Sequence, residues 1–212
     1  MAHEGQAITL NEAAHKSFMG YLDNTRHSAR DKAIYLLTYR AGMRIGTVAQ
    51  LELSDILNVS STNSTSTKST STKSTSTKST SIKLKEVVIM RKAITKGGKT
   101  VTAFINHPEL VEALQAWLEE RKGNCRKTLF YSQKGAPFTP NNLSRVMLRH
   151  YEGAGYEGSS SHSGRRAFAS NCLKGGMDIV ALSKVMSHAS INTTMRYVHH
   201  DESELLGLIA NV

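Results

Sequence analysis

The chain has 212 residues and a hydrophobic content of 39%, enough to bury the core of one domain, or of one domain with an appendage. It contains no run of about 18 apolar residues, and its first residues lack the basic start and apolar stretch of a signal peptide, so we expect neither a transmembrane helix nor secretion. The net charge of +10 favours a polyanionic partner, and nucleic acid is favoured over a membrane surface. The alternative interpretation is a soluble protein that is basic without such a partner.

The first part of the chain is expected to form helices and then strands. Apolar periodicity predicts helices over residues 8–21 and 28–42, with a short helix after Gly42 in RIGTVAQLEL. The segments LSDILNV, EVVIMRKAI and KTVTAFI are typical of strands, and KGGK is expected to form the turn between the last two. These strands predict one small antiparallel sheet.

The second part of the chain is expected to be helical. Pro108 and Pro140 stand at the first position of two helices, a place where proline fits well, and the second helix is expected to run through YEGAG. Further helices are predicted from about residues 164, 178 and 191, followed by the apolar tail ELLGLIANV. The predicted fold class is therefore α+β, a helical body with one small sheet.

A low-complexity segment, Ser60 to Lys83, interrupts this pattern. It contains STSTK at 64–68, 69–73 and 74–78 and then STSIK at 79–83, with no apolar residue before Ile82. Such a segment has nothing to bury, so we expect a disordered loop inserted into a single domain that spans residues 1–212. An expanded repeat tolerated on the surface is the favoured interpretation, because loop-closure entropy grows slowly with length. The alternative is a basic tether, through its four lysines, for the DNA backbone.

Several residues are candidates for phosphate chemistry, although each is ambiguous alone. His162 and Arg165 lie three residues apart near a helix start, where free N–H groups suit an anion, but such pairs are common on solvated helix faces. His188 and Tyr197 are nine residues apart and would point to opposite sides of one unbroken helix. The sequence SHAS predicts a break between them, with Ser190 as the N-cap of the second helix, which allows both side chains to face one pocket.

Two further candidates come from the first half of the chain. Arg44 follows Gly42, where the glycine is expected to end one helix and the arginine to open the next. Lys96 stands at the entry to the KGGK turn and is expected at a hairpin tip. The stretch GGKT is not a nucleotide-binding P-loop, because Ala93 occupies the position of the first glycine of that motif.

Four segments together resemble, in order and spacing, the tyrosine recombinase (phage integrase) family: AGMRIGTVAQLELSDI, ITKGGKTVTAFI, SSSHSGRRAFAS and LSKVMSHASINTTMRYVHH. The resemblance spans roughly residues 10 to 205, interrupted by the repeat. It implies a mostly helical catalytic domain with a small sheet. The family's series of arginine, hairpin lysine, His-x-x-Arg, histidine and nucleophilic tyrosine falls here on six residues: Arg44, Lys96, His162, Arg165, His188 and Tyr197.

The resemblance implies that this site cleaves DNA. Two guanidinium groups, on Arg44 and Arg165, suit the non-bridging oxygens of a phosphodiester, because a planar fork binds two oxygens at once and offsets the charge of the transition state. The family assigns the nucleophile to Tyr197 and the base that takes its proton to His162. Lys96 would protonate the leaving 5′ oxygen and His188 would hydrogen-bond the phosphate.

The implied product is a 3′-phosphotyrosine with a free 5′-hydroxyl, formed without ATP or metal, so no cofactor is expected. The cysteines Cys125 and Cys172 lack metal-ligand spacing and fit a reducing cytoplasm, and His199-His200-Asp201 lacks further ligands at usable spacing. We therefore predict no metal site and a cytoplasmic protein associated with the nucleoid.

Three positions depart from the family's usual pattern. Thr47 occupies the place of a frequent acidic residue that supports the first arginine, Gly164 replaces a common leucine, and Ser187 replaces a frequent glycine. None of these changes removes a reacting group.

The resemblance also predicts partners. The family usually carries an N-terminal core-binding domain, for which this chain has no room, so it resembles the catalytic domain alone, as in the small fimbrial-switch invertases. Double-stranded DNA is the expected partner, bound by a homo-oligomer (a tetramer on paired sites) that exchanges C-terminal tails, with accessory DNA-bending proteins and no membrane.

Two other functions remain open: a non-catalytic DNA-binding regulatory relative, and a DNA-relaxing enzyme of the type IB topoisomerase kind. The complete set of six residues favours catalysis over the first. The small size and bacterial-type motifs favour recombination over the second.

Overall fold

The computed structural model describes residues 9–58, 83–95, 98, 100–121 and 126–198. Residues 60–82 of the repeat segment, Lys96 and the C-terminal tail lie outside these ranges. The elements in chain order are α1 (Glu12–Asp23), α2 (Ser28–Tyr39), α3 (Ile45–Val48), α4 (Leu53–Ile56), β1 (Val87–Met90), the 3₁₀ turn η1 (Lys92–Ile94), β2 (Val101–Phe104), α5 (Pro108–Glu120), α6 (Pro140–Gly153), α7 (Ser163–Lys174), α8 (Ile179–Val185) and α9 (Ile191–Met195).

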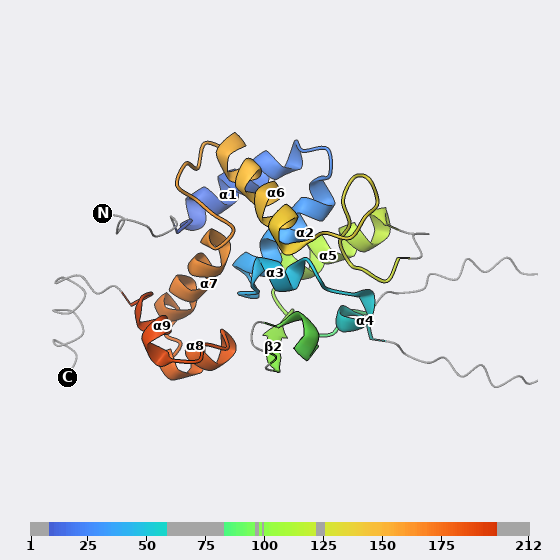
Figure 1. Cartoon of the computed structure of the whole chain (residues 1–212). Coiled ribbons are helices and arrows are strands. Elements are labelled where there is room, and N and C mark those ends of the chain that lie inside the picture. Colours follow the sequence, from blue (N-terminus) through green and yellow to red (C-terminus); the bar gives the residue numbers. More distant parts are fainter. Residues whose placement is uncertain (1–8, 59–82, 96–97, 99, 122–125, 199–212) are drawn as a thin grey trace, which may run out of the picture.

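Helix α2 is the centre of the helical body. It packs against α1, α3, α5 and α7, and α3 packs in turn against α6. Every residue of α2 from Ala33 to Tyr39 is buried. Figure 1 shows α1, α2 and α6 in the upper part of the molecule, with α7 leading down to α8 and α9 and the hairpin below α3. Among the described residues, none of the helices is long and apolar enough to cross a bilayer.

Local signals set several helix boundaries. The side chain of Asn11 accepts a hydrogen bond from the Ala14 backbone N–H at 2.9 Å, so α1 begins at Glu12 rather than near residue 8. Thr139 caps α6 in the same way through Asn142, with Pro140 at the first helical position as predicted. The predicted cap of the last helix, Ser190, is also confirmed.

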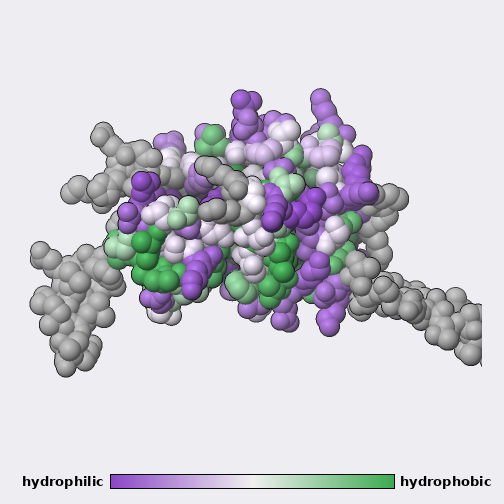
Figure 2. All heavy atoms as spheres, turned by 60° about the horizontal axis from the view of Figure 1, so that its bottom comes forward, coloured by the Kyte–Doolittle hydropathy of each residue, from purple (hydrophilic) through white to green (hydrophobic). Residues whose placement is uncertain are grey.

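The prediction of one small antiparallel sheet is confirmed by β1 and β2. Val87 pairs with Phe104 and Met90 with Val101, so the two strands are joined by residues 91–100 rather than by a tight turn at KGGK alone. Val88, Met90 and Ala103 are buried on one face, whereas Val87, Ile89 and Phe104 are exposed on the other. Figure 2 shows apolar side chains gathered in two regions of this side of the molecule, one near the hairpin and one over the C-terminal helices.

The predicted strand LSDILNV is wrong, because Leu53–Ile56 forms helix α4. The spacing of Leu53, Ile56 and Leu57 is that of one helix face, and the backbone N–H of Glu52 donates to the Asp55 carboxylate at 2.8 Å, which holds the first turn. In the described part of the chain, single bridges flank the helix, from Glu52 to Thr128 and from Leu57 to Leu84.

The two ends of the repeat are held together. Leu57 and Leu84 form an antiparallel bridge, and the backbone N–H of Asn58 donates to the carbonyl of Lys83 at 2.9 Å. The Lys85 N–H donates to the carbonyl of Ile56 at 2.8 Å. The insertion therefore leaves and re-enters the fold at one point, and closing the chain there needs no rearrangement of the core.

Candidate active site

Arg44 lies at the sharp exit from α2. Gly42 has φ of +60°, and a Cβ added to it would lie 2.4 Å from Cδ1 of Phe168 on α7. Both the left-handed conformation and this close approach require glycine. Arg44 then opens α3 with extended backbone, and its Nη2 donates to the carbonyl of Ser187 at 3.4 Å. The turn thus brings Arg44 to the segment between α8 and α9.

Arg165 is buried in the first turn of α7, with 7% of its surface exposed. Its Nη1 donates to the carbonyl of Gly42 and its Nη2 to the carbonyl of Met186 at 2.6 Å. Burial, followed by repulsion from Arg44, lowers the pKa of Arg165 to about 10. Among the described residues, neither Arg44 nor Arg165 contacts a carboxylate, and both are held by backbone carbonyls. Two clustered guanidinium groups without a counter-ion are suited to bind an anion.

His188 is held between Arg165 and Thr194. Its Nε2 lies 3.3 Å from Arg165 Nη2 and its Nδ1 lies 2.8 Å from the Thr194 hydroxyl. Because a guanidinium only donates, Nε2 must accept, and Nδ1 therefore carries the proton of the neutral ring. Burial, followed by the charges of Arg165 and Arg44, lowers the pKa of His188 to about 4. The ring is therefore neutral at neutral pH.

Tyr197 lies two residues beyond the end of α9, beside His188. The two rings are stacked, with centroids 6.1 Å apart and an interplanar angle of 20°. The Arg166 guanidinium lies 5.8 Å from the centroid of the tyrosine ring, and the ring packs on a small core that contains Leu182 and Met186. The break predicted between His188 and Tyr197 is present, and it brings both side chains to one side.

The site opens into a cavity of about 320 Å³ that Arg44, Thr47, Thr95 and His162 help to line. His162 stands at the N-cap of α7, exposed at the rim. Tyr197 lines another cavity, of about 780 Å³, together with residues of α7, α8 and α9. The structure therefore gathers Arg44, Arg165 and His188, with His162 at the rim. It does not place Tyr197 in the cavity of Arg44.

Lys96 lies outside the described residues, as do His199 and His200. Thr95, which directly precedes Lys96 in the sequence, lines the cavity beside Arg44, so the chain passes this cavity just before Lys96. Within the described ranges, no three His, Cys, Asp or Glu side chains lie together as a metal site requires.

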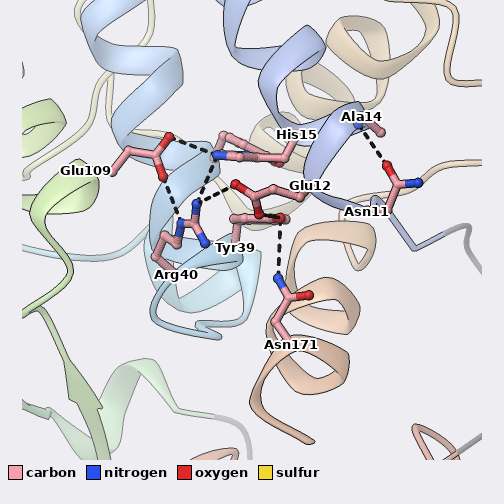
Figure 3. Close-up of polar contacts among 9 residues, drawn as sticks. Asn11, Glu12, Ala14, His15, Tyr39, Arg40, Glu109 and Asn171 are labelled. Carbon is pink, nitrogen blue, oxygen red and sulfur yellow. Dashed lines mark hydrogen bonds and ion pairs between the residues drawn. The ribbon is translucent and has the colours of Figure 1, made fainter. Parts of the chain in front are cut away.

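A polar network fixes the end of α2 that leads to Arg44 (Figure 3). Arg40 donates through Nε to Glu109 of α5 at 2.8 Å, and His15 of α1 contacts the other oxygen of the same carboxylate at 2.8 Å. Tyr39 accepts a hydrogen bond from Asn171 of α7 at 3.3 Å and stacks on His15, with centroids 4.2 Å apart. The network ties three neighbouring helices to α2 at the point where the Arg44 turn begins.

The structure shows the surroundings of the three residues that depart from the family pattern. A Cβ on Gly164 would lie 2.2 Å from the Thr38 hydroxyl, so glycine is required there. Ser187 has φ of +51°, a conformation in which glycine is less strained, which explains why glycine is frequent at this position. Thr47 is buried, and its hydroxyl donates to the carbonyl of Ile94 at 3.3 Å, linking α3 to η1.

Sequence reasoning missed two residues of the site. Thr194 orients His188 and is fully buried, and Phe168 covers the turn at Gly42. Neither has a signal in a single sequence, because a threonine and a phenylalanine are ordinary residues in a helix.

Comparisons with known proteins identify relatives of this chain. The tyrosine recombinase XerD of Rickettsia bellii is 29% identical over 202 residues, covering 90% of this chain and 59% of that protein. The tyrosine recombinase XerC of Pelobacter propionicus is 26% identical over 179 residues, covering 84% of this chain and 50% of the relative. The chain thus spans between half and three fifths of the length of these curated relatives.

Solved structures show the same fold. XerA recombinase aligns over the whole chain and 66% of its own length, with a TM-score of 0.70 and 22% identity. The integrase of transposon Tn1549 in complex with transposon right end DNA aligns over the whole chain and 68% of its own, with a TM-score of 0.68 and 18% identity. The model of the phage integrase family matches residues 9–204, and the chain belongs to that family.

Proposed function

We propose that this chain is the catalytic domain of a site-specific DNA recombinase of the integrase or invertase type. The observation that carries the proposal is the pair formed by Arg44 and Arg165. They are held by the carbonyls of Ser187, Gly42 and Met186 and have no carboxylate partner among the described residues. A phosphodiester supplies the negative charge that such a pair lacks.

The reaction exchanges one phosphodiester for another. The Tyr197 oxygen attacks phosphorus, the bond from phosphorus to the 5′ oxygen breaks, and a 3′-phosphotyrosine forms. His162, at the rim of the cavity, accepts the phenol proton, and Lys96 protonates the leaving 5′ oxygen. A 5′-hydroxyl from another strand then reverses the step and displaces the tyrosine. The number of phosphodiester bonds is conserved, so the exchange consumes no ATP.

We expect the Tyr197 segment to move when the covalent bond forms. The tyrosine ring now lines the 780 Å³ cavity, whereas Arg44 lines the smaller one. His188 stacks on Tyr197 and contacts Arg165, so it lies between the nucleophile and the phosphate site. As α9 moves, we expect His188 to release Arg165 and turn a ring N–H toward the phosphate.

We further propose a homo-oligomer, a tetramer on paired sites, in which C-terminal tails are exchanged. The large cavity beside Tyr197 has apolar lining from Leu10, Ile179 and Met195, and the C-terminal sequence ELLGLIANV is apolar. Removal of residues 203–212 should leave the domain folded and reduce assembly on paired DNA, as measured by mass photometry. An unchanged assembly would contradict tail exchange. Accessory DNA-bending proteins and association with the nucleoid remain predictions.

The experiment that tests catalysis uses nicked suicide duplexes built from the DNA that flanks the gene. The wild-type chain should form a covalent protein–DNA adduct that resists denaturation. Tyr197→Phe should form none, and Tyr21→Phe, a matched change on α1, should leave the adduct unchanged. An equal adduct with Tyr197→Phe would contradict the assignment of the nucleophile.

The same assay separates the alternatives. DNA binding without any adduct would identify a regulatory relative. An adduct accompanied by relaxation of supercoiled plasmid, without exchange between two duplexes, would identify a topoisomerase activity.

A further inference from the structure

A second basic cleft lies at the end of α6 that is remote from α3. A cavity of about 310 Å³ lies in this cleft. It is lined by the turn between α1 and α2, the first turn of α2, residues 132–133 and the last turns of α6. Among the residues that the structure describes, none of those proposed for the active site lines this cavity.

One carboxylate in this cleft is fully engaged. Arg30 is buried and donates through Nε to Oδ1 of Asp31 at 2.8 Å, and His150 contacts Oδ2 of the same residue at 3.1 Å. Arg30 also lies over the ring of Phe138, 5.4 Å from its centroid. Asp31 therefore neutralises groups in the wall and has little capacity left for further cations.

Three other groups in the cleft have no such partner. Arg26 and Arg149 line the cavity, are exposed, and make no hydrogen bond or ion pair with any residue that the structure describes. His27 also lines the cavity, and its Nε2 is buried without a hydrogen-bond partner in the described part of the chain. Glu120, the acidic group that acts on His27 from α5, does not line the cleft. A small anion with several acceptor oxygens would satisfy all three groups.

We propose that this cleft binds a phosphate group of the DNA backbone, outside the segment that is cleaved. The inference rests on the proposed function, since it assumes that DNA lies across the active site. Pro140, at the start of α6, packs against Gly46 beside Arg44, and Arg149 lies nine residues farther along the same helix. Nine residues of helix span about 14 Å, which corresponds to about four base pairs of duplex at about 3.4 Å each. A duplex that runs from the active site along α6 would have phosphates at this distance.

The test measures binding of a 30-bp duplex as a function of salt, because each neutralised phosphate contributes a fixed amount to the salt dependence. Arg26→Ala and Arg149→Ala should each reduce the slope of log K against log salt by about 1 and weaken binding by about 5- to 10-fold. Lys16→Ala is the matched control, since it removes one exposed charge on α1 that does not line the cleft. It should change the slope by much less. Thermal melting shows that each variant is folded.

The outcomes separate this proposal from others. Slopes for Arg26→Ala and Arg149→Ala equal to that of Lys16→Ala would overturn it. Titration of the protein with inorganic phosphate, followed by NMR of the arginine side chains, identifies a free anion as the source. Phosphate binding at Arg149 with an unchanged DNA slope would also overturn the proposal. If the wild-type chain binds no duplex at low salt, the proposed function itself fails, whereas a normal Tyr197 adduct with unchanged slopes rejects only the second site.

Discussion

The neutral state of His188 should be visible in the pH dependence of stability. Its pKa is lowered from 6.5 to about 4, first by burial and then by the charges of Arg165 and Arg44. Between these two values the unfolded chain binds a proton at this position and the folded chain does not. Stability contributed by the neutral ring is therefore present above pH 6.5 and is lost as the pH falls toward 4.

The size of the effect follows from the two pKa values. At pH 5, pKa values of 6.5 and about 4 correspond to a loss of about 2 kcal/mol relative to pH 7, and the partial exposure of the ring reduces this to about 1 to 2 kcal/mol. His188→Asn removes the titrating group and keeps an amide donor in reach of Thr194. The free energy of unfolding in urea is measured for both proteins at pH 7, 6 and 5.

The difference between the two proteins isolates His188, because the other histidines titrate in both. Near pH 7 the variant should be less stable than the wild type by about 1 kcal/mol, because it loses the hydrogen bond that Arg165 donates to the His188 ring. By pH 5 that difference should shrink by about 1 to 2 kcal/mol or change sign. A difference that stays constant from pH 7 to pH 5 would refute the assignment of a neutral, buried ring that accepts from Arg165.

Three other changes, one of them with a matched control, test the turn at Gly42, the guanidinium of Arg165 and the repeat. Gly42→Ala should lower the free energy of unfolding in urea by about 2 to 5 kcal/mol, because Gly42 has a left-handed φ and lies against Phe168. The control is Gly20→Ala on α1, where the space around the glycine is open, and this change should raise the free energy of unfolding by about 0.5 to 1 kcal/mol. Arg165→Lys should reduce adduct formation by about 100-fold or more, since an ammonium cannot hold two carbonyls and a phosphate as a planar fork does. Replacing residues 59–82 with Asn-Gly should preserve the adduct and raise the free energy of unfolding by up to about 2 kcal/mol, because the ends already pair.

Each of these predictions has an outcome that contradicts it. Equal stability of Gly42→Ala and Gly20→Ala would show that the α2 exit tolerates a side chain. If Arg165→Lys forms as much adduct as the wild type, the planar guanidinium group of Arg165 is not needed for cleavage. A folded variant without residues 59–82 that forms no adduct would show that the repeat has a function in cleavage.

Local sequence signals determined much of the fold. Ser190, Asn11 and Thr139 are caps whose hydrogen bonds close within three residues, and Pro140 starts a helix because proline needs no N–H there. The buried face of α5, with Leu110, Leu114 and Trp117, is also a local signal, because its helical period repeats along one element. The prediction failed where two local patterns compete. LSDILNV has the apolar content of a strand, but the spacing of its apolar residues and the contact between Glu52 and Asp55 favour a helix.

The order of the six matched residues likewise came from the sequence, but their arrangement did not. Arg44 reaches Ser187 across 143 positions of the chain, and Arg165 holds Gly42 across 123. No periodicity or cap encodes contacts of that separation, because they depend on how α7, α8 and the α2 exit pack. The packing alone decided that two arginines share a site with no carboxylate partner from the described part of the chain, that His188 is neutral, and that Tyr197 lines a neighbouring cavity.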